Sequence, residues 1–285
     1  MKRLWKPALV VLLLLVATVL WIYKDKIQRL RWATTLFSGA EQYEQLARVP
    51  ELFPTARLEP AEKPFLWPEG ARISLPETFD HSGSSVNVAT FLTETDTSAL
   101  LLIKDGEIRS ESYFLTGGKD VQWISFSVAK SFISALVGIA VSEGHIRSID
   151  DPASDYLPEL AGSGYEDVRI KDILQMSSGA SWNEDYSDFD SDINRMGRVF
   201  ALGGSLDEFI TTLSRDFDPG TYIRYNSTDT QVLGRLLVAT TGRSISDYMT
   251  EKLWHPIGAE APGYWMLDDY GMEMAFAEAR LFIPI

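Results

Sequence analysis

Ser127 and Lys130 are the residues whose types and spacing point most directly to chemistry in this 285-residue chain. They lie three positions apart, so on a helix both side chains share one face and the lysine nitrogen can reach the serine oxygen. A lysine in an apolar helix loses hydration, and desolvation lowers its pKa, so that more of the neutral amine is present. A neutral amine can accept the hydroxyl proton, so the pair is a candidate nucleophile with its general base.

The Ser-x-x-Lys spacing alone is a weak signal, because ordinary residue frequencies give about one such match in a chain of this length. Its position strengthens the interpretation, since a nearly continuous apolar run follows it as far as Gly144. We predict one helix from Ser125 onward, with Ser125 or Ser127 near the N-terminal cap and Gly144 just past the end. A helix that is apolar on almost every side belongs in the middle of a domain, and its first N–H groups can stabilise an oxyanion.

Tyr225 and Ser227 lie on a predicted loop between a Pro-Gly turn and a helix over residues 228–241. Polar side chains at the start of a helix can project into a cleft. A tyrosine in this position is by default a packing residue. Only the presence of Ser127 and Lys130 in the same chain makes Tyr225 a candidate proton carrier.

Composition and motifs exclude several other classes of function. The net charge of −14 argues against nucleic acid or an anionic lipid surface as the main partner of the soluble part. The absence of cysteine excludes disulfides, thiol catalysis and cysteine-ligated metals. The three histidines are isolated, and no Gly-x-Ser-x-Gly, His-Glu-x-x-His or phosphate-loop motif occurs. A Ser-His-Asp triad therefore has little support, and we predict no cofactor and no metal.

The acidic stretch over residues 185–192 raises the question of a calcium loop. It lacks both the glycine at the sharp turn and the closing glutamate in register that such a loop needs. We interpret it as a solvated loop. Aromatic residues near it, such as Trp182 and Tyr186, are interpreted as core or as the lining of a cleft.

The elements that must position these residues are a hairpin and several helices. Two runs, over 97–104 and 107–114, flank Asp105-Gly106, which is a strong signal for a two-residue hairpin turn. The first run is continuously apolar, so we expect it inside a sheet, with the hairpin packed on the Ser127 helix. Short helices are predicted around 156–160, 170–176 and 205–215. At 45% hydrophobic content the chain can bury a sizeable core.

Residues 1–24 are predicted to form an N-terminal membrane anchor or signal. Lys2, Arg3 and Lys6 precede an apolar run over 7–23 that ends in Trp-Ile-Tyr, an interfacial aromatic pattern. No Ala-x-Ala cleavage site follows, so an uncleaved anchor is favoured over a removed signal. The membrane is then a partner through this segment, and the bulk of the chain is expected outside the cytoplasm, on the periplasmic side.

Residues 25–76 are predicted to hold a juxtamembrane helix followed by a proline-rich linker or wrapping arm. The prolines recur from Pro50 to Pro76 and prevent long regular structure. A plain tether is favoured over a recognition site. Residues 77–285 are predicted to form the domain that carries the candidate chemistry.

Several motifs in a consistent order resemble those of the beta-lactamase-related serine hydrolases. They are Ser127-Val128-Ala129-Lys130, Asp150-Asp151-Pro152, Tyr156-Leu157-Pro158, Leu174-Gln175-Met176-Ser177-Ser178-Gly179, and Pro219-Gly220-Thr221 before Tyr225-Asn226-Ser227. The resemblance runs from about residue 100 to 276. Within the family, the chain resembles class C beta-lactamases, esterases of that fold and aminohexanoate-oligomer hydrolases. This ordered set is far more specific than Ser-x-x-Lys alone.

The resemblance implies a beta-lactamase/transpeptidase-like α/β (α+β sandwich) fold, with an antiparallel sheet and a helical lobe. It implies that Ser127 is the acyl-accepting nucleophile, that Lys130 is its base, and that Tyr225 passes a proton to the leaving group. Ser227 is implied in substrate binding, at a position where many relatives carry asparagine, and this variant favours the esterase and amide-hydrolase branch. The implied activity is hydrolysis of a small amide or ester through an acyl-enzyme.

The family's third motif, Lys-Thr-Gly or a His-x-Gly equivalent on a later strand, is not found after Tyr225. Residues 271–276 begin a stretch similar to the family's next segment, and the sequence ends at Ile285. The expectation is therefore an incomplete domain whose C-terminal strands are missing. An unpaired sheet edge and the loss of one oxyanion donor, worth about 3–4 kcal/mol, would follow. The alternative function is a non-catalytic truncated remnant or ligand-binding module of the same fold.

Overall fold

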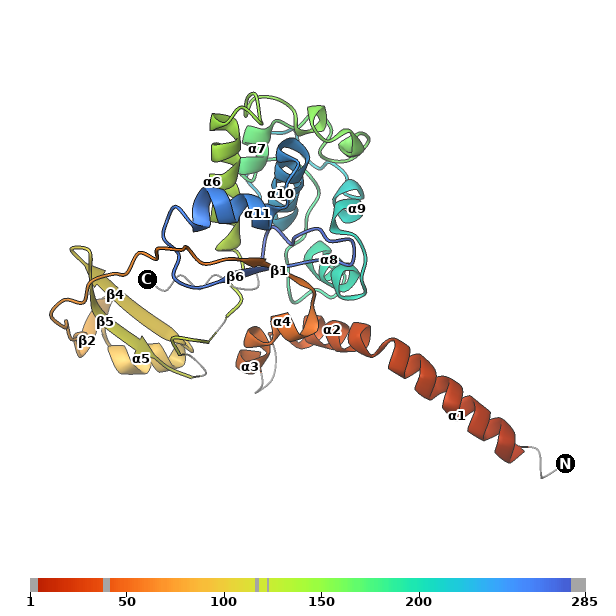
Figure 1. The fold of residues 1–285 in the computed structure, drawn as a ribbon, viewed down its shortest axis with the longest axis horizontal. Helices are drawn as coiled ribbons and strands as arrows, with labels where there is room; N and C mark the ends of the chain where they lie inside the picture. Colours follow the sequence, from red (N-terminus) through yellow and green to blue (C-terminus); the bar gives the residue numbers. More distant parts are fainter. Residues whose placement is uncertain (1–4, 38–41, 116–117, 122, 278–285) are drawn as a thin grey trace.

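The computed structural model describes residues 5–37, 42–115, 118–121 and 123–277, and its architecture is mixed α/β (Figure 1). Its N-terminal helices are α1 (Trp5–Ile22), α2 (Lys24–Thr35), α3 (Gln42–Ala47), α4 (Val49–Leu52) and α5 (Val88–Glu94). Its later helices are α6 (Ala129–Ser142), α7 (Ile170–Leu174), α8 (Asp192–Ala201), α9 (Leu206–Thr211), α10 (Ser227–Thr241) and α11 (Ile245–Met249). Short 3-10 turns lie at Ala153–Asp155 and Pro158–Leu160, and a π-helical turn lies at Thr250–Trp254.

The strands form small antiparallel sheets of two strands each. β1 (Thr55–Leu58) pairs with β6 (Gly263–Met266), β2 (Thr78–His81) with β3 (Ser84–Asn87), and β4 (Ala99–Lys104) with β5 (Glu107–Tyr113). The first pair joins segments far apart in sequence and lies between the helices around α10 and those around α2 (Figure 1). Its Leu58 and Trp265 are fully buried, so this small sheet belongs to the core.

Within the segment predicted over residues 1–24, Trp5–Ile22 forms α1, which extends away from the rest of the chain (Figure 1). Among the described residues, no helix is both long enough and apolar enough to cross a membrane. The predicted membrane-spanning anchor is therefore not supported. Lys2 and Arg3 of that prediction lie outside the described residues, and the location outside the cytoplasm stays a prediction.

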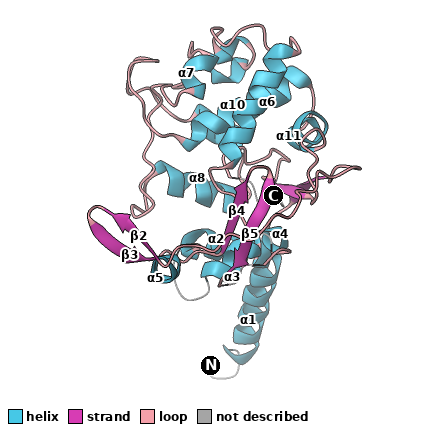
Figure 2. Cartoon of the chain, turned by 90° about the vertical axis from the view of Figure 1, so that its left-hand side faces the viewer, coloured by secondary structure: helices cyan, strands magenta, loops and turns pink. Residues whose placement is uncertain are grey.

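The predicted hairpin is confirmed by β4 and β5. Asp105 and Gly106 both have positive φ angles, 56° and 75°, as a two-residue turn matched to strand twist requires. The predicted burial is wrong, because every residue of β4 is half-buried or exposed. The hairpin lies apart from α6 rather than packing on it (Figures 1 and 2). Among the described residues β4 pairs only with β5, so it is not inside a sheet.

The proline-rich region is a wrapping arm rather than a plain tether. Its early part supplies β1, and its later part follows the edge of β5, where the N–H of Gly70 donates to the carbonyl of Ile108 at 3.0 Å. The N–H of Ile108 in turn donates to the carbonyl of Pro68 at 2.9 Å. The prolines prevent a long strand here, and the arm therefore pairs through short contacts.

The predicted central helix is confirmed by α6, which buries one stripe of its surface against α10. The buried residues, spaced at helical intervals, are Ala129, Ile133, Leu136, Val137 and Ala140. The predicted start is wrong, because the α-helix begins at Ala129 instead of Ser125 and neither predicted serine caps it. The reason lies at Phe126, whose φ of +45° is left-handed and cannot continue a helix.

The predicted helix over 228–241 is confirmed by α10. Asn226 is its N-cap, with a side chain that accepts a hydrogen bond from the N–H of Thr228, and Gly242 ends it with a φ of 69°. Nearly every residue from Ser227 to Leu237 is buried, so α10 is the second central helix. The helices predicted over 170–176 and 205–215 are present but shorter, as α7 and α9.

The prediction that C-terminal strands are missing concerns a part of the chain that the structure covers only to residue 277. Within the described ranges no strand follows β6. Residues 278–285, on which the rest of that prediction falls, lie outside the described residues. The described segment after β6 is nonetheless well anchored, because the side chain of Gln231 on α10 bonds both to Glu273 O and to Ala275 N–H.

Candidate active site

The structure brings the three predicted catalytic side chains together at the start of α6. The Nζ of Lys130 donates a hydrogen bond to the Oγ of Ser127 at 3.0 Å. The phenolic OH of Tyr225 donates to the same Oγ at 2.7 Å, although Tyr225 lies 98 residues further along the chain. All three groups are therefore within direct proton-transfer distance of one another through a single serine oxygen.

Lys130 lies in a partly apolar environment that changes its acidity. Burial lowers the pKa of the amine to about 8, and the carboxylate of Glu184 opposes that shift. The rings of Tyr225 and Phe276 lie 5.2 Å and 5.5 Å from Nζ, and the carbonyl of Phe276 accepts a hydrogen bond from it at 3.1 Å. An amine with this pKa is partly neutral near neutral pH, so it can act as a base.

Ser127 is presented on a strained turn in front of α6. The preceding residue, Phe126, has a left-handed φ of +45°, a conformation that costs a bulky residue about 1–3 kcal/mol. The N–H groups of residues 128–131 each donate to a carbonyl three residues earlier. For the N–H of Ser127, no acceptor occurs among the described residues. This N–H group is a candidate donor to a substrate oxygen.

Ser227, predicted to bind substrate, is buried at the start of α10. Its Oγ donates to Oε1 of Glu184 at 2.7 Å and its N–H donates to Oε2 at 3.1 Å. The indole N–H of Trp182 donates to the same carboxylate at 2.5 Å. The direct role of Ser227 in substrate binding stays a prediction, since its observed contacts tie the Tyr225 loop to Glu184.

Glu184 and Phe276 are site residues that sequence reasoning missed. Glu184 directly precedes the acidic stretch that was interpreted as a solvated loop, and only its position two residues after Trp182 distinguishes it. Phe276 contributes a main-chain carbonyl, which carries no residue-type signal. Both lie on segments remote from Ser127 in the sequence, so no local spacing could have placed them beside Lys130.

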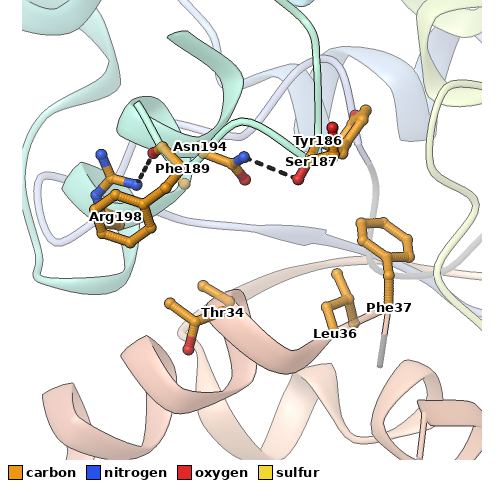
Figure 3. Close-up of a pocket in the computed structure, with 10 residues that line it drawn as sticks. Thr34, Leu36, Phe37, Tyr186, Ser187, Phe189, Asn194 and Arg198 are labelled. Carbon is orange, nitrogen blue, oxygen red and sulfur yellow. Dashed lines mark hydrogen bonds between the residues drawn. The ribbon is translucent and has the colours of Figure 1, made fainter. Parts of the chain in front are cut away.

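The acidic stretch forms a loop that is held against α8. The side-chain amide of Asn194 donates to the carbonyl of Tyr186 at 3.1 Å (Figure 3) and to the carbonyl of Asp188 at 2.8 Å. Hydrogen bonds from Ser187 lower the pKa of Asp185, so the ionised carboxylate of Asp185 stabilises the turn in which it lies. In the described ranges, no group of three acidic or histidine side chains could hold a metal ion.

A buried polar network lies behind the Tyr225 loop. Oδ1 of Asp229 accepts hydrogen bonds from the Oγ of Ser178 at 2.7 Å and from the OH of Tyr165 at 2.8 Å. Asn226 donates to the same phenol oxygen at 3.3 Å. Oδ2 of Asp229 has no hydrogen-bond partner in the described part of the chain. Burial raises the pKa of this carboxyl to about 7, while the hydrogen bonds from Ser178 and Tyr165 oppose the shift.

Asp229 should make the stability of the protein depend on pH. A carboxyl whose pKa is higher in the folded state stabilises most below its unfolded pKa, and this contribution is lost as pH rises through about 7. Between about pH 5 and about pH 8 the free energy of unfolding should therefore fall by roughly 2–3 kcal/mol from this group. The Asp229→Asn variant keeps the Oδ1 acceptor and should lose that part of the slope.

The measurement for Asp229 is urea unfolding of both proteins at the two pH values. The carboxyl of Asp207, whose pKa burial raises to about 6, titrates in both proteins and cancels in the difference. Equal pH slopes for the wild type and Asp229→Asn would show that Asp229 is ionised throughout.

Residues 87–268 match the family model named Beta-lactamase. The match covers more than half of the chain and includes Ser127, Lys130 and Tyr225. The chain belongs to the beta-lactamase family. Family membership accounts for the order of the motifs. It leaves α2 and Phe276 outside the matched range.

Individual relatives agree with this assignment. The chain is 30% identical to the 6-aminohexanoate-dimer hydrolase of Paenarthrobacter ureafaciens over 241 residues, which cover 80% of this chain and 58% of that protein. It is 31% identical to penicillin-binding protein 4 of Amycolatopsis lactamdurans over 137 residues, which cover 47% and 34% of the two chains. The chain thus spans somewhat more than half the length of the first of these relatives.

The fold is also found in a solved structure from Bacillus anthracis, provisionally described as a 6-aminohexanoate-dimer hydrolase. The two structures align with a TM-score of 0.77 over 86% of this chain and 67% of the other, at 17% sequence identity. At that identity the likeness concerns the fold alone. The predicted beta-lactamase/transpeptidase-like fold, with helices and small antiparallel sheets, is confirmed.

Proposed function

We propose that this protein is a serine hydrolase that cleaves an amide or ester bond through an acyl-enzyme on Ser127. The observation that carries the proposal is the convergence of Lys130 Nζ and Tyr225 OH on one serine oxygen, at 3.0 Å and 2.7 Å. Membership of the beta-lactamase family supports it, and so does the similarity to a 6-aminohexanoate-dimer hydrolase, whose name describes cleavage of an amide dimer.

In the first half-reaction, the Oγ of Ser127 attacks the carbonyl carbon of the substrate and its proton passes to the neutral amine of Lys130. The substrate oxygen becomes an oxyanion, which the N–H of Ser127 is positioned to stabilise. The bond from carbon to nitrogen or oxygen of the leaving group then breaks. The phenol of Tyr225 gives its proton to the departing amine or alcohol and regains one from the ammonium of Lys130.

In the second half-reaction, a water molecule attacks the acyl carbon on Ser127. Its proton passes through Tyr225 or Lys130, and the bond from Oγ to the acyl carbon breaks. The oxygen of Ser127 regains a proton and the carboxylic acid leaves. Protons and electrons balance without a metal or cofactor, so the three side chains and water are sufficient for the cycle.

Covalent labelling tests the proposal directly. A fluorophosphonate probe should modify the wild type, and peptide mass spectrometry should locate the adduct on Ser127. The Ser127→Ala variant should give no adduct while keeping the thermal unfolding transition of the wild type. A folded wild-type protein that forms no adduct with this probe or with a fluorescent penicillin would favour the non-catalytic alternative.

Tyr225→Phe should distinguish the step that this phenol serves. The amine of an amide substrate is a poor leaving group and needs a proton to depart. For an amide, kcat/KM should therefore fall by about 10²–10⁴-fold. A p-nitrophenyl ester has a leaving group that departs without a proton, so its acylation should fall much less. Tyr222→Phe, which alters an exposed tyrosine of the same loop, is the matched control. Equal losses for both substrates would contradict the proton-donor role.

A further inference from the structure

A cavity of about 110 Å³ adjoins the candidate nucleophile, and one of its walls comes from the N-terminal helix α2. The α2 side of the lining consists of Trp32 and Ala33 on the helix, with Leu36 and Phe37 directly after it. Ser127 and Lys130 also line this cavity. The remaining lining is largely apolar and includes Ile193, Met196, Phe200, Met266, Met274 and Phe276.

Helix α2 is firmly held in this position. The guanidinium of Arg29 donates to Oδ1 of Asp269 at 2.8 Å and to the carbonyl of Leu52 at 2.7 Å. The indole N–H of Trp32 donates to the carbonyl of Gln45 at 3.1 Å, and the ring itself is buried. Both polar and apolar contacts thus hold α2 in place as a wall of the cavity.

Phe37 lies where this cavity meets a second pocket, because its side chain lines both. Its ring packs 5.6 Å from that of Phe126 and 5.4 Å from that of Tyr186, in an edge-to-face arrangement with the second. Beyond these rings lies a wider and more polar pocket of about 320 Å³, between the end of α2 and the loop before α8 (Figure 3). Figure 3 shows Leu36 and Phe37 on one side of this pocket, facing Tyr186 on the other.

The position of the cavity indicates which part of a substrate it would hold. Attack by Ser127 joins its oxygen to the acyl carbon, so a cavity that reaches Ser127 from one side accommodates the acyl group or the leaving group. Tyr225 serves the leaving group in the proposed mechanism, and among the described residues it does not line this cavity. The cavity therefore lies on the acyl side.

We propose that this cavity binds a short, unbranched aliphatic acyl group and that Ala33 and Phe37 limit its length. This inference rests on the proposed hydrolase function. An apolar cavity of about 150 Å³ can hold benzene, so about 110 Å³ suits a chain of about four carbons and excludes a ring. Each methylene group buried there should raise kcat/KM by about fourfold. Helix α2 lies outside the range that matches the family model.

The test compares p-nitrophenyl acetate, butanoate and octanoate as substrates of the full chain. The wild type should prefer butanoate over acetate by about 15-fold in kcat/KM, the effect of two buried methylene groups. Ala33→Phe places a ring in the cavity and should remove most of that preference. Phe37→Ala opens the cavity toward the second pocket and should raise the ratio of octanoate to butanoate. Ile27→Ala, on the exposed face of α2, is the matched control and should change neither ratio.

The outcomes separate this inference from the function on which it rests. Ester hydrolysis that depends on Ser127, with ratios that neither Ala33→Phe nor Phe37→Ala alters, would overturn the acyl-length inference alone. Absence of any Ser127-dependent hydrolysis would overturn both. If circular dichroism shows that Ala33→Phe does not fold, Phe37→Ala alone tests the acyl-length inference. Phe37→Ala should fold, because it removes atoms from an exposed residue.

Discussion

Replacing Ser127 with alanine is expected to reduce hydrolysis of esters and amides by about a million-fold, the largest effect of any single change in this chain. The hydroxyl is the atom that bonds to the acyl carbon, and neither Lys130 nor Tyr225 can replace it from its observed position. Both hydrogen bonds converge on Ser127 Oγ, so the variant leaves a base and an acid without a nucleophile. Initial rates with p-nitrophenyl acetate, and the size of any initial burst, measure the loss.

Ser134→Ala provides the matched control for that experiment. Ser134 lies on α6, is exposed, and undergoes the same chemical change two helical turns beyond the nucleophile. It should retain the wild-type rate and the wild-type unfolding transition. Residual turnover in Ser127→Ala at more than about a thousandth of the wild-type rate would contradict a covalent mechanism on this serine.

The pairing of Ser127 with Lys130 could be predicted from the sequence because helical geometry alone brings residues three apart onto one face. The place of Tyr225 could not be predicted in that way, since 98 residues of chain separate it from the serine. The assignment of Tyr225 to the site rests instead on the order of several motifs that resemble those of a known family. The structure supplies the physical basis, a loop held by the buried carboxyl of Asp229 and by Glu184.

Other features depended on contacts that no local pattern encodes. The left-handed φ of Phe126 delays the start of α6 and turns Ser127 outward from the helix, whereas the composition of the segment favours helix from Ser125. Strand β4 has the composition of a buried strand yet is only half-buried, because burial depends on which elements cover it. Helix α2 was interpreted as a juxtamembrane helix. Its role as a cavity wall follows from ion pairing with Asp269, which is remote in sequence.

Replacing Lys130 is expected to give a large loss of activity and to change the pH dependence of the reaction. Lys130→Ala should lower kcat/KM by about 10²–10⁴-fold, the usual contribution of a general base. Lys130→Arg should be nearly as inactive, because a guanidinium keeps the positive charge and the donors but cannot accept a proton. If the amine acted only as a charge near Ser127, the arginine variant would retain most of the activity.

The pH profile identifies the role of Lys130 more sharply than the size of the loss. Below a pKa of about 8 the amine is protonated and cannot accept the serine proton, so kcat/KM of the wild type should rise with pH and level off above about 8. Both Lys130 variants should lack this rise over the same range. Lys104→Ala, at the exposed end of β4, should keep the wild-type profile. A wild-type profile that is flat between about pH 6 and about pH 9 would mean that the base has another identity, because no neutral amine with a pKa near 8 would then limit the rate.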